Sequence, residues 1–167
     1  MRYRCSHNGT FEGYDHFDAA KEYYLKAMQI DPQEGIVFNQ LAVIENLKPQ
    51  KSLHKIVFYY LRAMIAESPF QAAKDNLLRV IRKPECADDP VMKVIRRSSE
   101  NRPLGSSLAE IQKTIDLDSE SGAFISSAIN LAFLLFQKDH KSLPFSLTSD
   151  SQLRQLLQGC PLSGPLQ

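Results

Sequence analysis

The chain contains a six-residue motif twice, and the two copies begin 36 residues apart. The first copy is YYLKAM at Tyr23–Met28 and the second is YYLRAM at Tyr59–Met64, so that they differ only by Lys26 and Arg62. Repetition at this distance is typical of stacked helical units, each of which buries its apolar face against its neighbours. The repeat therefore predicts an all-α chain made of units close to the roughly 34 residues of a tetratricopeptide repeat.

The residues around each copy follow the second helix of a tetratricopeptide unit, which has a small residue, an aromatic residue, an alanine and a terminating proline in order. In the first copy this series consists of Ala20, Tyr24, Ala27 and Pro32. The second copy fits less well at both ends, with Ile56, Tyr60, Ala63 and Pro69. Small residues let two helices approach closely while the aromatic ring fills the groove beside them. We therefore expect Tyr24 and Tyr60 at equivalent buried positions.

Apolar residues at three- and four-residue spacing predict helices separated by turns that contain proline or glycine. The expected helices cover residues 16–30, 36–47, 53–67, 69–82, 90–97, 108–117 and 122–138. We expect residues 1–83 to form a tetratricopeptide-like repeat region and 84–107 a linker with a short helix. Residues 108–140 would add a helical hairpin to the same array, and 141–167 would form a poorly ordered tail.

Composition excludes several classes of protein. The net charge is +1, so no overall field attracts the chain to nucleic acid or to an anionic membrane. The longest apolar run, 123–136, is interrupted by polar residues and is shorter than the roughly 20 residues of a membrane span. Dispersed cysteines argue against a zinc site and a disulfide framework, and they favour a reducing compartment: Cys5, Cys86 and Cys160. We expect a cytoplasmic or nuclear protein with no membrane partner.

Residues suited to catalysis or metal binding are scattered. The histidines have no partner at ligand spacing: His7, His16, His54 and His140. Asp88 and Asp89 are adjacent carboxylates, but they have no basic or nucleophilic companion in the sequence and are expected to be solvated. Neither a serine-hydrolase elbow nor a glycine-rich phosphate loop is present in the sequence. The sequence predicts that the protein is not an enzyme and needs no cofactor or metal.

One local excess of basic residues lies between residues 79 and 102. Its members are Arg79, Arg82, Lys83, Lys93, Arg96, Arg97 and Arg102. Such a cluster could contact RNA or DNA phosphates, and the candidate contacts are Arg79, Arg82, Lys83, Arg96 and Arg97. The alternative is a solvated helix end, because cations interact favourably with the C-terminal end of a helix dipole.

Several blocks of residues between 20 and 78 follow one another in a distinctive order. They are Tyr23-Tyr24, Asp31-Pro32 through Gly35, Asn39 to Ala42, Phe58 to Arg62, Ser68 to Phe70, Ala73 and Asn76-Leu77. In order and spacing they resemble the N-terminal domain of the SMG proteins of nonsense-mediated mRNA decay and of their relative, the telomerase-associated Est protein of yeast. The Asn39-Gln40 pair is the most specific piece, because a bare repeat helix needs no polar pair there.

The resemblance implies a 14-3-3-like, tetratricopeptide-containing fold whose concave face binds a phosphoserine peptide of the phosphorylated decay helicase. Arg2 followed by Tyr3 is similar to the end of the family's Gly-Asp-x-x-Arg-Tyr stretch, which makes Arg2 the phosphate ligand by resemblance and Tyr3 its neighbour. A guanidinium can hold two phosphate oxygens at once. Asn39 would lie where related phosphopeptide binders place a side-chain amide near the peptide backbone.

The sequence departs from the family pattern before Arg2, because the Gly-Asp pair, the upstream helices and their lysine are missing. One explanation is that the chain is a fragment of a longer member, which we favour. The other is that the phosphate site has decayed and the scaffold remains.

From the resemblance we expect a non-catalytic adaptor of nonsense-mediated mRNA decay that binds a phosphorylated partner through a helical-repeat groove. Its partners would be the phosphorylated decay helicase and another SMG-type adaptor. A second hypothesis is a repeat scaffold that binds its partner without phosphate. A third is a telomerase-associated module that binds RNA or telomeric DNA.

Overall fold

The described residues of the computed structural model form an all-α helical array. They comprise residues 14–103, 108, 109, 111, 113 and 119–136, and among them no β-strand occurs. The helices are α1 (Tyr14–Ile30), α2 (Gly35–Leu47), α3 (Leu53–Ile65), α4 (Ala73–Ile81), η1 (a 3-10 helix, Pro84–Cys86), α5 (Pro90–Ser99) and α7 (Glu120–Phe136). Within the described part of the chain, no helix is both long enough and apolar enough to cross a membrane. The expected tail, 141–167, lies outside these residues.

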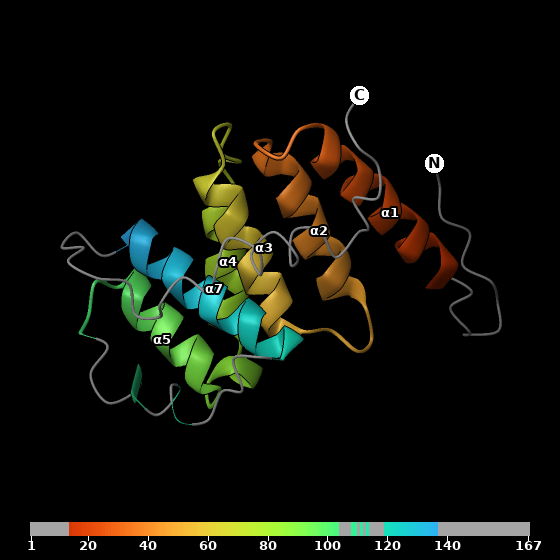
Figure 1. Ribbon diagram of the computed structural model, residues 1–167. Helices are drawn as coiled ribbons and strands as arrows, with labels where there is room; N and C mark the ends of the chain where they lie inside the picture. The colour runs from red at the N-terminus through yellow and green to blue at the C-terminus, as the bar shows by residue number, and fades with distance from the viewer. Residues whose placement is uncertain (1–13, 104–107, 110, 112, 114–118, 137–167) are drawn as a thin grey trace.

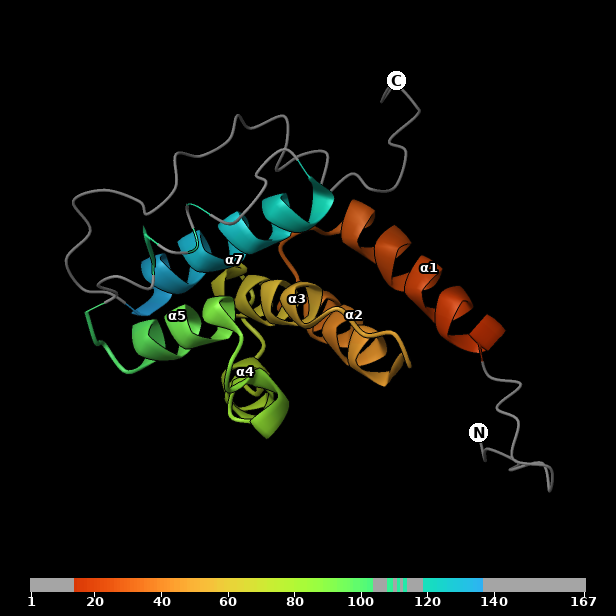
Figure 2. The same ribbon diagram turned by 90° about the horizontal axis from the view of Figure 1, so that it is seen from below.

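The first four helices alternate in direction, and α3 lies at the centre of the array (Figure 1). Helix α3 packs on α2, α4 and α7, while α1 packs on α2. Helices α5 and α7 lie side by side in both views (Figures 1 and 2), and they contact one another directly. The expected alternation of short turns and antiparallel helices is therefore present in this segment.

Side-chain and backbone caps fix the ends of the helices. Ser52 begins α3, and its hydroxyl oxygen accepts a hydrogen bond from the Lys55 amide at 3.5 Å. Asp89 begins α5 and accepts from two backbone amides, with Pro90 in the first helical position. Just after α5, Asn101 has a φ of 54°, the left-handed conformation that asparagine tolerates at a helix end. These local signals explain why the helices begin and end where they do.

Two clusters of buried side chains form the core. The larger cluster joins α3, α4, α5 and α7, and in it the rings of Phe58 and Phe124 meet edge to face with centroids 5.2 Å apart. The smaller cluster joins α1, α2 and α3 around the fully buried Phe38. Helix α3 contributes to both clusters and packs on α2, α4 and α7, so it is the central element of the array.

The two copies of the repeated motif are not equally buried. Tyr60 in α3 is 3% exposed, whereas Tyr24 in α1 is only half-buried. Tyr23 is 73% exposed, while its counterpart Tyr59 is half-buried and packs against the ring of Phe124 with centroids 6.3 Å apart. The expectation of equal burial is wrong because α3 has neighbours on several sides, whereas the strong contacts of α1 among the described helices are with α2 alone.

Backbone hydrogen bonds join the α1–α2 turn to the α3–α4 turn. The amide of Gly35 donates to the carbonyl of Ser68 at 2.9 Å, and the amide of Ser68 donates to the carbonyl of Gln33 at 3.1 Å. A Cβ atom on Gly35 would lie 2.6 Å from the carbonyl oxygen of Ala63, which is backbone and cannot move aside cheaply. The close approach of the two turns therefore requires glycine at position 35.

We predict that Gly35→Ala lowers the free energy of unfolding by about 1–3 kcal/mol, because the added methyl group must push the two turns apart. Urea unfolding followed by circular dichroism measures the change. Gln29→Ala, on the exposed side of α1, is the control and should stay within about 0.5 kcal/mol of the parent protein. Equal stability of Gly35→Ala and the parent would contradict the importance of this contact.

Candidate ligand-binding site

Asn39 is the predicted phosphopeptide contact that falls within the described residues. Its side chain is 4% exposed, and its amide oxygen accepts a hydrogen bond from Nδ2 of Asn76 at 3.0 Å. A buried amide needs such a partner, since an unpaired polar group costs free energy away from water. The other two predicted contacts, Arg2 and Tyr3, lie outside the described residues, so their roles remain predictions.

The Asn39–Asn76 pair connects α2 with α4, two helices that both pack on α3. Asn76 is half-buried and therefore more accessible than Asn39. Each amide carries both donors and acceptors, so the pair can exchange its mutual bond for bonds to the backbone of a ligand. The sequence alone does not predict Asn76 as a site residue, although its place beside Leu77 belongs to the family resemblance.

Arg62 is a second polar group in this region that the sequence alone does not single out. Its guanidinium carbon lies 5.0 Å from the ring centroid of Phe38, the residue that precedes Asn39. Burial lowers the pKa of the Arg62 guanidinium, but an arginine stays charged at neutral pH. Its Nε atom is buried, and among the described residues it has no hydrogen-bond partner. Arg62 is the one position at which the two motif copies differ, so the repeat itself could have drawn attention to this residue.

The five basic residues proposed for nucleic-acid contact play different parts. Arg96 donates through Nη2 to the carbonyl of Ile81, and Arg97 donates through Nε to the carbonyl of Pro103 at 2.8 Å. Arg96 therefore joins α5 to the end of α4, and Arg97 holds the chain that follows α5. Lys83 lies 3.8 Å from the carboxylate of Glu85.

Arg79 and Arg82, the other two, are exposed at the C-terminal end of α4, and no ion pair joins either of them to another described residue. They are three residues apart and therefore lie on one side of the helix end. The structure does not bring all five basic residues into one free patch. It leaves Arg79 and Arg82 as the candidate pair.

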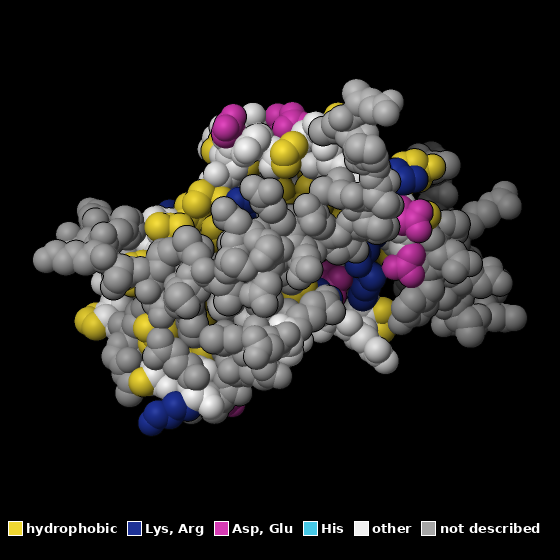
Figure 3. All heavy atoms as spheres, viewed as in Figure 1, with side chains coloured by type: hydrophobic (Ala, Val, Ile, Leu, Met, Phe, Trp, Pro, Cys, Tyr) yellow, Lys and Arg dark blue, Asp and Glu magenta, His cyan; other side chains and the backbone are white. Residues whose placement is uncertain are grey.

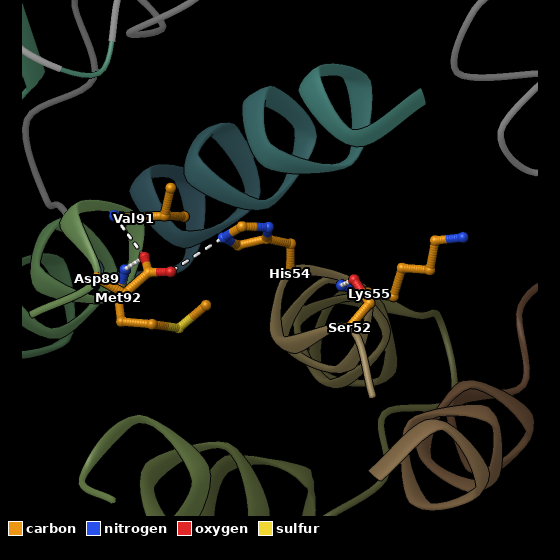
Figure 4. Close-up of polar contacts among 6 residues, drawn as sticks. All are labelled: Ser52, His54, Lys55, Asp89, Val91 and Met92. Carbon is orange, nitrogen blue, oxygen red and sulfur yellow. Dashed lines mark hydrogen bonds and ion pairs between the residues drawn. The ribbon is translucent and has the colours of Figure 1, made fainter. Parts of the chain in front are cut away.

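His54 and Asp89 form a contact between the starts of α3 and α5 (Figure 4). Nε2 of His54 lies 3.2 Å from Oδ2 of Asp89, while Oδ1 of Asp89 accepts from the amides of Val91 at 2.8 Å and Met92 at 3.0 Å. The expectation that Asp89 is a solvated acid with no basic companion is wrong, because His54 contacts it. The chain brings them together across 35 residues.

The contact between His54 and Asp89 has a structural role. Burial raises the pKa of the Asp89 carboxyl, but hydrogen bonds from His54 and from the Met92 and Val91 amides outweigh it and hold the pKa below its ordinary value. No group of three potential metal ligands occurs among the residues that the structure describes. The contacts shown for Asp89 fix a helix start and join two helices.

Residues 20–155 match the family described as "Est1 DNA/RNA binding domain". A telomerase-binding protein EST1A from Danio rerio is 26% identical over 152 residues, covering 71% of this chain and 10% of the relative. A nonsense-mediated mRNA decay factor SMG7 from Danio rerio is 36% identical over 64 residues, covering 38% of this chain and 5% of the relative. No solved structure matches the chain significantly.

We predict that Asp89→Asn lowers the free energy of unfolding at pH 7 by up to about 1 kcal/mol, because asparagine keeps the cap but loses the charge opposite His54. The folded-state pKa of Asp89 is below its unfolded value of about 3.9. Its stabilisation is therefore complete above that unfolded value and is lost as the pH falls through the folded-state value.

Unfolding of the parent and of Asp89→Asn between neutral and acidic pH measures this effect. The stability difference should be constant above about pH 5 and shrink toward zero in stronger acid. A difference that is the same at neutral pH and well below the folded-state pKa would show that the charge of Asp89 contributes nothing.

Proposed function

The chain belongs to the family of the Est1 DNA/RNA binding domain, and from this premise we propose that it is a non-catalytic, peptide-binding adaptor module of nonsense-mediated mRNA decay. It spans about a tenth or less of the length of the relatives it matches. The proposal therefore concerns this helical segment. A phosphorylated decay helicase and another SMG-type adaptor are its proposed partners, and a cytoplasmic or nuclear location is part of the proposal.

The observation that carries the proposal is the Asn39–Asn76 amide pair across α2 and α4. An extended peptide exposes backbone N–H and C=O groups that need partners when they leave water. Two adjacent side-chain amides can supply both kinds of partner at one place, and rigid helices hold them in position. We propose that the peptide backbone forms hydrogen bonds mainly with Asn76, and that Asn39 holds the Asn76 side chain in position.

Arginines would provide the phosphate specificity. Arg2 is the proposed phosphate ligand and Tyr3 its neighbour, as the family resemblance implies. A guanidinium binds a phosphate through charge-assisted hydrogen bonds, and clustered basic groups commonly recognise phosphorylated motifs. Arg62 lies over the ring of Phe38, the residue before Asn39, and its positive charge would favour an anionic ligand at this face of α2 and α3.

A second candidate function is contact with RNA or telomeric DNA, and the family description supports it. The exposed pair Arg79 and Arg82 at the end of α4 suits phosphate contact without base recognition. Helix α4 also carries Asn76, so peptide and nucleic acid would use different parts of one helix.

We predict that a phosphoserine peptide of the decay helicase type binds more tightly than its unphosphorylated twin. Arg2→Glu should abolish this difference, and Asn76→Ala should weaken both peptides about 3- to 10-fold, since one neutral hydrogen bond contributes roughly 0.5–1.5 kcal/mol. Lys93→Glu, an exposed charge reversal on α5, is the control and should have no effect. Fluorescence anisotropy measures the affinities.

Equal binding of the two peptides would contradict phosphate recognition and favour the scaffold hypothesis. Absence of binding by either peptide would contradict the peptide-binding proposal for this segment. Circular dichroism of each variant shows whether a loss of binding comes from a loss of fold.

We predict that reversing both arginines, Arg79→Glu with Arg82→Glu, weakens binding of a single-stranded oligonucleotide. The dependence of log K on log salt should become shallower by about 0.7 for each phosphate that the variant no longer binds. The control is Lys74→Glu, an exposed charge reversal at the opposite end of α4. Oligonucleotide binding that is absent at low salt, or unchanged in the double variant, would exclude this role for the pair.

A further inference from the structure

Three isoleucines are exposed at the end of the array where the α1–α2 and α3–α4 turns are joined. Ile30, the last residue of α1, is 86% exposed, Ile36 in the first turn of α2 is 45% exposed, and Ile65, the last residue of α3, is 37% exposed. None of them belongs to either core cluster. Large apolar side chains grouped on a surface mark places where another molecule binds.

The bonded turns bring these residues to one place. Ile36 follows Gly35, which bonds to Ser68, and Ser68 lies three residues after Ile65. Figure 1 shows the two turns next to one another, above the centre of the array. The α1–α2 turn is short, so Ile30 is held at the same end. Because backbone hydrogen bonds join the turns, this end is a rigid platform.

The same end is acidic. The two turns contribute Asp31, Glu34 and Glu67, and residues 31–36 and 65–72 contain no lysine or arginine. None of the three carboxylates forms an ion pair with another of the described residues. Figure 3 shows acidic and apolar side chains close together at the upper edge of the molecule. We call Ile30, Asp31, Glu34, Ile36, Ile65 and Glu67 the turn-end surface.

The opposite turn of the array provides a contrast. Lys48 and Lys51 in the α2–α3 turn each pair with a carboxylate of another element, Asp18 at 3.1 Å and Glu85 at 2.8 Å. The charges of that turn are therefore matched within the molecule. The charges of the turn-end surface have no such match among the described residues, so a partner with the opposite charge would complete them.

We propose that the turn-end surface docks a basic amphipathic helix of a partner protein. Apolar side chains at i, i+3 and i+4 of such a helix would cover the three isoleucines, and flanking lysines or arginines would meet the three carboxylates. This surface is formed by turns and helix ends, whereas the Asn39–Asn76 pair lies within α2 and α4.

The test uses a synthetic helical peptide of about 18 residues, with leucine at the apolar positions and lysine elsewhere. Its twin carries glutamate in place of lysine. The lysine peptide should bind to the full chain and lose affinity as salt rises from about 0.05 to 0.5 M, because exposed charges are screened. The glutamate peptide should not bind. Equal binding of both peptides would overturn the proposal.

Variants locate the binding site. Ile30→Lys combined with Glu34→Lys should weaken the lysine peptide by at least about tenfold. Leu47→Lys is the control, because Leu47 is 56% exposed at the other end of α2, and this variant should bind like the parent. A similar loss in both variants would overturn the proposal. So would sedimentation showing that the parent pairs with itself through this end while Ile30→Lys is monomeric, since a second copy would then be the occupant.

Discussion

The hydrogen bonds between the two turns at Gly35 are the constraint on which the rest of the array depends. They fix how the first helix pair sits on the second, since α2 starts against the end of α3 with no room for a side chain between them. With this register set, the ring of Phe38 lies under Arg62, and Asn39 reaches Asn76. The same contact gathers three isoleucines at one end.

The packing of α3 determines where the polar groups on this helix lie. Six of its 13 side chains are buried in two apolar clusters and three more pack against them, so its orientation is set by hydrophobic packing. This orientation places Arg62 against Phe38 of α2 and His54 against Asp89 at the start of α5. Helices rather than loops thus position the amide pair and the arginine, which favours a preformed binding site.

The sequence predicted the helices and turns well, because periodicity, prolines and caps are local signals. The end of the first helix at Ile30 and the start of α3 at Leu53 are examples, because both agree with the expected bounds. It did not reveal that Asn76 partners Asn39 or that Asp89 partners His54, since these contacts join residues 37 and 35 positions apart. Nor did it show that Tyr24 is less buried than Tyr60, because burial depends on how many helices surround each copy. The expected phosphate ligand, Arg2, lies outside the described residues.

The measurement that tests the central claim most directly is an NMR titration of the isotope-labelled chain with a phosphoserine peptide, followed through the side-chain amide signals of asparagine and the Nε signals of arginine. If the amide pair is the peptide contact, the signals of Asn76 and Asn39 should shift together as the peptide binds. The Nε signal of Arg97, which donates to the carbonyl of Pro103, should not shift. If the peptide binds and the signals of Asn39 and Asn76 do not change, the amide pair is a structural link between α2 and α4, and the binding site lies elsewhere.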